Sequence, residues 1–284
     1  MGPILIFLAV IPVIIICTYI YRKDKNKEPG SLLVKLFLLG IASCFLVLLL
    51  SEIVFKILPF MSKGTESMTF FEVMAYSFIG VALIEEFCKW LMVYKGAYSD
   101  RAYDEVYDGI VYAVYVSLGF AFFENLLYVV GNGSIVVGIS RGLLAVPGHA
   151  CDAVFMGYYL SLAKVYSYQG NKELEKKNLI LSIIVPTILH GIYDFCLFSQ
   201  VDILLLVFFV FVVAIYVISI KKISQLSEKC KSKPTYNQPK QQYSTPQNQY
   251  IQPQQTTYIQ NRFCPNCGTP ITGVFCSNCG TRQN

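Results

Sequence analysis

Long apolar runs separated by short polar segments dominate the first four-fifths of the chain. A helix needs about 20 apolar residues to cross a bilayer, and seven runs approach or exceed this length. Because lipid offers no partners to the backbone, runs of this kind predict an all-α polytopic membrane protein. We expect crossings at approximately 3–21, 31–58, 70–94, 108–131, 135–166, 178–198 and 201–220.

The positions of lysine and arginine predict the orientation in the membrane. With seven crossings and the N-terminus outside, most basic residues fall in the inner segments, and the outer loops contain only Lys63. This asymmetry is typical of a protein whose basic loops are cytoplasmic. The basic cluster follows the first apolar run, which indicates a retained helix and not a cleaved signal peptide. The inner segments are 22–30, 95–107, 167–177 and the tail after 220.

The composition supports a membrane domain spanning residues 1–222. Hydrophobic residues make up 55% of the chain and charged residues 14%, against about 25% charged residues in a typical soluble protein. The net charge of +5 is accounted for by the inner loops. We therefore expect the lipid bilayer of the cell membrane as a partner, and no nucleic acid.

The composition changes after the last apolar run. Residues 223–262 are rich in Gln, Pro, Tyr and Ser, and Tyr-x-x-Pro recurs at Tyr236, Tyr243 and Tyr250. A proline in every repeat excludes a continuous helix. The segment is typical of a disordered or polyproline-II-like linker. Tyrosine-mediated self-association or partner docking is the alternative interpretation.

Two Cys-x-x-Cys pairs, each followed by glycine, predict a zinc ribbon at 263–284. Four thiolates suit tetrahedral, structural Zn²⁺ and leave no open position for catalysis. The alternative is a pair of disulfides, which a cytoplasmic location disfavours. Such a module also offers a surface for a protein partner. The four expected ligands are Cys264, Cys267, Cys276 and Cys279.

Three ionisable residues interrupt the apolar stretch "LIEEFCKWLM". A charge near the bilayer centre costs at least about 2.5–3.5 kcal/mol, so these residues should be paired or functional. Glu85 and Glu86 lie four and three positions before Lys89, so one ammonium can reach both carboxylates on a helix. A structural ion pair requires only one acid. The second acid therefore indicates acid–base chemistry.

Both histidines of the chain also lie within apolar runs. His190 has Asp194 four positions later, His149 has Asp152 three positions later, and Glu124 is a further buried acid. Such groups on separate helices are explained most simply if they converge on one hydrated cavity. There a glutamate can take a proton from water while a histidine stabilises the oxyanion. The combination predicts hydrolysis of an amide bond inside the membrane.

The segments "IEEFCKW", "YDGIVYAVYVSLGFAFFENLLYV", "GHACDAVFMGYYLSLAK" and "LHGIYDF" resemble the PrsW family of intramembrane proteases, over about residues 70–198. That family looks like a distant relative of the type II CAAX prenyl endopeptidases, the CPBP group. The resemblance implies a bacterial peptidase that makes the first cut in a single-span, membrane-anchored regulatory protein, typically an anti-sigma factor. It implies no catalytic cofactor.

The resemblance also implies roles for individual residues. Glu85 or Glu86 would activate the water, and Lys89 would hold the pair. Two departures from the prenyl endopeptidases matter: Phe120-x-x-x-Glu124 replaces Phe-x-x-x-His, and the first motif ends in Lys and not Arg. The prenyl-protein substrate class is therefore not carried over. The residues expected to line the site and stabilise the tetrahedral intermediate are Glu124, His149, His190 and Asp194.

Two other functions fit the same residues. His149, His190 and either Glu86 or Glu124 match the ligands of a catalytic zinc, although His-Glu-x-x-His is absent. Buried acids, a lysine and histidines are also found in proton-coupled transporters and sensors. No inverted repeat is apparent, which disfavours a transporter.

Overall fold

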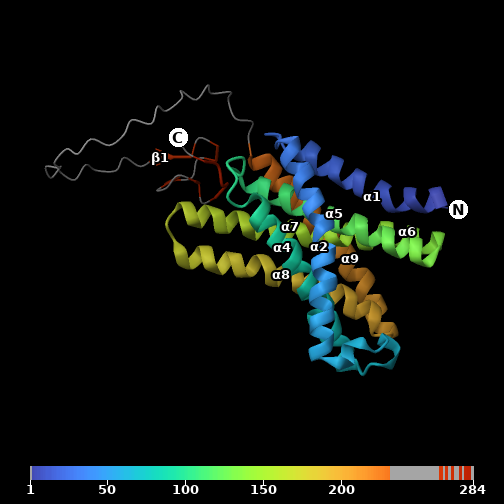
Figure 1. Ribbon diagram of the computed structural model, residues 1–284. Coiled ribbons are helices and arrows are strands. Elements are labelled where there is room, and N and C mark those ends of the chain that lie inside the picture. Colours follow the sequence, from blue (N-terminus) through green and yellow to red (C-terminus); the bar gives the residue numbers. More distant parts are fainter. Residues whose placement is uncertain are drawn as a thin grey trace.

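The structure is a computed structural model that describes residues 2–230, 262–264, 266–267, 270–271, 275–276 and 278–282. Helices account for nearly all of the first of these ranges (Figure 1). Short 3₁₀ turns η1 (Pro59–Ser62) and η2 (Thr65–Ser67) follow the second helix. The α-helices are α1 (Gly2–Lys23), α2 (Gly30–Ile57), α3 (Phe70–Ala75), α4 (Ile84–Ala97), α5 (Val106–Asn132), α6 (Ile135–Leu143), α7 (Ala145–Tyr168), α8 (Lys172–Phe198) and α9 (Asp202–Lys229).

The predicted all-α polytopic class is confirmed. In the described part of the chain, five helices are long and apolar enough to cross a membrane: α1, α2, α5, α8 and α9. The other two expected crossings are interrupted helices. The run 70–94 forms α3, a π-helical segment η3 (Tyr76–Leu83) and α4, and the run 135–166 divides into α6 and α7.

The π-helical segment directly precedes the two glutamates of α4. A π-helix departs from the regular i→i+4 pattern and is frequently found at functional sites. Here η3 packs closely on α8. The absence of a side chain at Gly191 allows this packing, since a Cβ there would lie only 2.3 Å from the Phe78 ring. A larger residue beside His190 would therefore push η3 and α8 apart.

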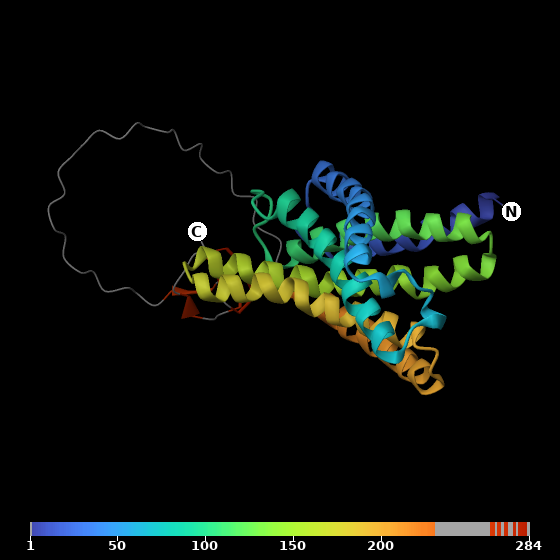
Figure 2. The same ribbon diagram turned by 60° about the horizontal axis from the view of Figure 1, so that its bottom comes forward.

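Helix α5 is the central element of the bundle (Figures 1 and 2). It contacts α1, α2, α4, α6, α7 and α9. Of its membrane-spanning window 67% is buried, against 17% for α1 and 22% for α9. Large apolar side chains of α1, α2 and α9 are exposed on the outside of the bundle, as expected for surfaces that face lipid.

Glycines allow the helices around α5 to approach closely. A Cβ at Gly40 of α2 would lie 2.0 Å from the carbonyl oxygen of Val116 in α5. A Cβ at Gly157 of α7 would lie 2.2 Å from the carbonyl oxygen of Gly109 in α5. Small residues of this kind are typical of membrane helix interfaces, where backbone packing replaces the hydrophobic effect.

Polar contacts gather several helix ends at one end of the bundle. Asn26, in the α1–α2 loop, donates to Glu105 at the start of α5 at 2.5 Å. Ser227 of α9 donates to the carbonyl of Lys23, and the Tyr112 hydroxyl donates to Glu28. The α1–α2 loop, the start of α5 and the end of α9 therefore lie on the same side.

The tail differs from expectation at its beginning. Helix α9 extends to Lys229, into the segment that the composition assigns to the linker. The expected disorder at 231–261 falls outside the described residues. Beyond it, β1 (Arg262–Phe263) pairs antiparallel with β2 (Pro270–Ile271), and the Phe275 ring lies 4.4 Å from that of Tyr168 in α7.

The buried glutamate of the α1–α2 loop generates a prediction on pH. Burial raises the pKa of Glu28 from 4.5 to about 7, and the neighbouring Asp24 adds to the rise against the opposing hydrogen bond from Tyr112. The folded protein thus holds this proton more tightly than the unfolded chain. The contribution to stability is present below pH 4.5 and is lost as the pH rises through about 7.

We expect Glu28→Gln, which keeps an oxygen for Tyr112, to raise the thermal unfolding temperature in detergent at pH 8 and to flatten its dependence on pH. The matched control is Glu52→Gln, because Glu52 is exposed on α2. Equal pH dependence in wild type and Glu28→Gln would contradict the assignment.

Candidate active site

The ammonium of Lys89 lies at the centre of the buried polar cluster. It donates to Glu85 Oε2 at 3.1 Å, Glu86 Oε1 at 2.8 Å and His149 Nδ1 at 3.1 Å. These contacts use all three of its N–H groups. The predicted pairing of Lys89 with both glutamates is present, and the lysine side chain is completely buried.

His149 connects this lysine to α5. Because an ammonium has no acceptor, Nδ1 of His149 must accept and the ring proton lies on Nε2. Nε2 then donates to Glu124 Oε2 at 3.0 Å. The suggested partnership of His149 with Asp152 is therefore wrong: the ring faces Glu124 and Lys89, because its direction follows the packing of α7 against α5.

His190 of α8 completes the cluster. Its Nδ1 lies 2.9 Å from Glu86 Oε1, and its Nε2 lies 3.4 Å from Asp194 Oδ2, which places Asp194 beside it as expected. Since each ring nitrogen faces a carboxylate, the imidazolium is the form that satisfies both. The rings of His149 and His190 are 5.2 Å apart.

The structure thus brings together all seven residues predicted for the catalytic site, from α4, α5, α7 and α8. Asp152, the partner suggested for His149, is itself buried in α7.

Sequence reasoning missed Arg141 of α6, whose Nη2 lies 2.7 Å from Glu124 Oε2. The signal was available, since a lone arginine within an apolar run must find a partner.

The two glutamates of the motif have different surroundings. Glu86 is fully buried, and its Oε1 receives both Lys89 and His190. Within the described residues, Glu85 is hydrogen-bonded only to Lys89, and 9% of its side chain is exposed. The more accessible rim of the cluster is formed by Glu124, 20% exposed, and Arg141, 18% exposed. The Glu85 side chain is therefore slightly more exposed than that of Glu86.

The membrane cluster also has the composition of a metal site. Ligand atoms of Glu85, Glu86, His149 and His190 all lie within 4.8 Å of one another, and two imidazoles with carboxylates suit zinc. However, the Lys89 ammonium is hydrogen-bonded to three of these four residues. Two cations at such short range repel strongly in a low dielectric. With Lys89 in this position, the donor set does not fit a metal ion.

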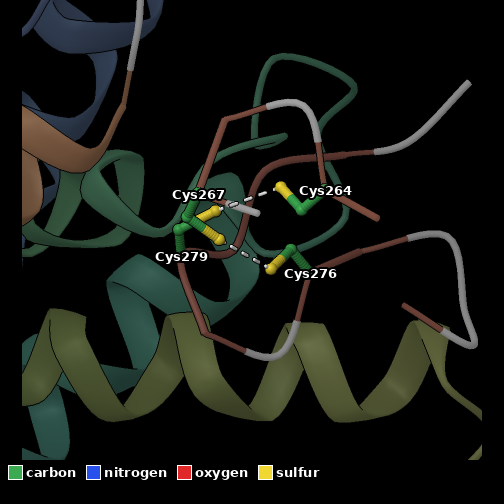
Figure 3. A group of neighbouring side chains, drawn as sticks. All are labelled: Cys264, Cys267, Cys276 and Cys279. Atoms are coloured by element: carbon green, nitrogen blue, oxygen red, sulfur yellow. Dashed lines mark hydrogen bonds between the residues drawn. The ribbon is translucent and has the colours of Figure 1, made fainter. Parts of the chain in front are cut away.

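The four tail cysteines form a separate cluster, in which the side chains point toward one another (Figure 3). The Sγ atoms of Cys264 and Cys279 are 3.6 Å apart, and those of Cys267 and Cys276 are 3.4 Å apart. Tetrahedral zinc with bonds of about 2.3 Å requires a sulfur separation of about 3.8 Å. The four free thiols are therefore placed to hold one metal ion.

Buried acids, imidazoles and a lysine meet between membrane helices, an arrangement that suits a membrane-embedded peptidase. Comparison with known proteins agrees. A family model described as "PrsW family intramembrane metalloprotease" matches residues 28–220. The chain belongs to the PrsW family of intramembrane proteases.

Curated relatives share this similarity over most of their length. The chain is 31% identical to Protease PrsW of Clostridioides difficile (strain 630) over 231 residues, which cover 80% of this chain and 93% of that protein. It is 38% identical to Protease PrsW of Oceanobacillus iheyensis over 209 residues, or 72% of this chain and 90% of that protein. It is 36% identical to Protease PrsW of Bacillus subtilis (strain 168) over 187 residues, or 66% and 79%. No solved structure matches the chain significantly.

The unequal pairing of the two glutamates predicts unequal effects on stability. Glu86→Gln removes the negative charge that both Lys89 and His190 face, and breaking a buried pair in this way costs about 3–5 kcal/mol. Glu85→Gln removes one contact at a slightly exposed site, so the loss should be smaller. Thermal unfolding in detergent measures both variants. An equal or larger loss for Glu85→Gln would contradict this ranking.

Proposed function

We propose that the protein cleaves a membrane-anchored regulatory protein by a glutamate-activated water, with Glu85 as the general base. The observation that carries the proposal is the position of Lys89, which binds both glutamates and His149 at once. The family assignment supports a peptidase over a transporter or sensor.

Glu85 is the better base because it is less constrained than Glu86. Glu86 is held by Lys89 and His190, so its negative charge is already balanced and its role is to position those two residues. In the described part of the chain, Glu85 is hydrogen-bonded to Lys89 alone, and it lies toward the accessible rim. A base in this position can take a proton from water and remain oriented by the ammonium.

The reaction then follows from the charges around Glu85. The water molecule gives one proton to Glu85, and the water oxygen attacks the carbonyl carbon of the peptide bond. The resulting oxyanion is stabilised by the nearby positive charges of Lys89 and His190, which act strongly because both side chains are buried. The protonated Glu85 next gives its proton to the leaving nitrogen as the C–N bond breaks. Glu124 and Asp194 hold His149 and His190 in place throughout.

The substrate we propose is a single-span membrane protein, with an anti-sigma factor as the specific candidate. A site enclosed by membrane helices suits a peptide that is itself in the bilayer, and the PrsW resemblance supports a regulatory substrate. We further propose that the N-terminus is outside. The basic residues at the end of α1 lie on the same side as the end of α9, as the positive-inside rule requires for cytoplasmic loops.

A metal-dependent reaction is the second candidate. It is favoured by the description of the family as metalloproteases and by the close approach of Glu85, Glu86, His149 and His190. It requires Lys89 to leave the centre of the cluster or to lose its proton. The three hydrogen bonds of that ammonium favour the glutamate mechanism.

Replacing the proposed base tests the mechanism. We expect Glu85→Gln to lower kcat by about 10²- to 10⁴-fold, the usual contribution of a general base. The assay places the purified chain in liposomes with single-span anti-sigma factors and follows the products by mass spectrometry. Glu52→Gln, exposed on α2, is the control. Unchanged cleavage by Glu85→Gln would remove Glu85 as the base.

Metal content distinguishes the two mechanisms. We expect one bound metal ion per chain, held by the ribbon, and none in a full-length Cys264→Ser, Cys279→Ser variant that still cleaves. Elemental analysis of the purified proteins provides the count. A metal ion that remains in the cysteine variant, together with cleavage that stops on its chelation, would favour the metal-dependent reaction.

A further inference from the structure

Arg141 is a charged residue of the membrane domain that the proposed reaction does not use. It lies on the short helix α6, with 18% of its side chain exposed. A guanidinium remains charged at any accessible pH, so within an apolar helix it requires partners. The residues that Arg141 contacts therefore indicate its role.

Among the described residues, Arg141 makes its polar and cation–π contacts with α5. Nη2 lies 2.7 Å from Glu124 Oε2, and Nε donates to Asn125 Oδ1 at 3.1 Å. The guanidinium carbon lies 4.0 Å from the centre of the Tyr128 ring. Two polar contacts and one stacking contact fix both the position and the plane of the guanidinium, which a lysine could not reproduce.

The Glu124 oxygen that Arg141 contacts also receives His149. Glu124 Oε2 lies 3.0 Å from His149 Nε2, and the other nitrogen of that ring accepts from Lys89. A chain of contacts thus runs from α6 through α5 and α7 to the lysine that holds the two glutamates. A displacement of Arg141 would alter the direction of Glu124 and then of His149.

Helix α6 is itself held in place at two points. A Cβ at Gly138 would lie 3.0 Å from Leu8, so α6 packs closely on α1, beside which it lies in Figure 1. At its end, the Tyr216 hydroxyl of α9 lies 3.0 Å from the Leu143 carbonyl oxygen and 3.2 Å from that of Leu144. The position of Arg141 therefore depends on α1 and α9, neither of which supplies a residue to the cluster.

We propose that Arg141 is a positioning residue for hydrolysis, which fixes Glu124 and through it the His149 ring that accepts from Lys89. This inference rests on the proposed peptidase function. It adds α6 to the catalytic apparatus and explains why an arginine lies in the run 135–166.

The test is a double-mutant cycle in the full-length chain, reconstituted with a cleaved single-span substrate. The variants are Arg141→Met, Arg141→Lys, Glu124→Gln and the double Arg141→Met, Glu124→Gln. Ile139→Met is the control, because Ile139 is exposed on the same helix. Thermal unfolding of each variant in detergent shows whether it is folded.

We expect Arg141→Met to lower kcat about 10- to 100-fold, the cost of misplacing a catalytic group by about 1 Å, with little change in KM. Arg141→Lys should recover part of the loss of kcat, since lysine restores the positive charge but cannot contact Glu124 and Asn125 at the same time, as the guanidinium does. The double variant should match Glu124→Gln alone, because Arg141 acts through Glu124. If Arg141→Met does not fold, the comparison of kcat is made between Arg141→Lys and the wild-type protein.

Two results would overturn the inference. One is a kcat for Arg141→Met and Arg141→Lys equal to that of the control. The other is a double variant whose loss is the product of the two single losses, which would mean that Arg141 acts independently of Glu124. Absence of cleavage by the wild-type protein is a different result, which would remove the proposed function and the inference with it.

Discussion

The ammonium of Lys89 is the interaction on which the site depends. Its side chain is completely buried, so leaving any of its three N–H groups without an acceptor would be costly. Two acceptors come from α4 and one from α7, while the Phe120 ring of α5 lies 4.1 Å from the charge. The close glycine contacts of α5 with α2 and α7 bring the helices near enough for these bonds to form.

The same contacts create the chemical difference between two adjacent glutamates. A carboxylate shared by two cationic donors is a weak base, whereas one with a single donor can accept a proton and return it. The π-helical segment η3 changes the helical repeat just before α4, and η3 packs tightly on α8 beside His190. Glu86 therefore faces inward, toward α8. Glu85 is then nearer the rim with Glu124 and Arg141. Backbone geometry thus gives two residues of the same type different surroundings.

Local spacing predicted the parts of the site that lie within one helix. The contacts of Lys89 with Glu85 and Glu86, and the position of Asp194 beside His190, follow directly from the three- and four-residue periodicity. The partner of His149 could not be predicted in this way, because it depends on how α5 and α7 cross.

The long continuous helices could be predicted from the sequence, but the breaks within two of the apolar runs could not. Length and hydropathy predicted the continuous helices, such as α2 and α5. The division of the run 135–166 into α6 and α7 leaves the apolar composition almost unchanged, so hydropathy could not detect it. That division places Arg141 beside Glu124, a pairing that hydropathy alone does not reveal.

The most direct measurement of this account is cleavage of a single-span protein by the purified chain and by its Lys89→Met variant, in liposomes, with the products identified by mass spectrometry. Methionine keeps the approximate shape of the side chain but removes all three donors. The account predicts that the wild-type protein cuts within the membrane-spanning segment and that Lys89→Met, with its helix content intact by circular dichroism, does not. Cleavage by Lys89→Met at the wild-type rate would contradict it.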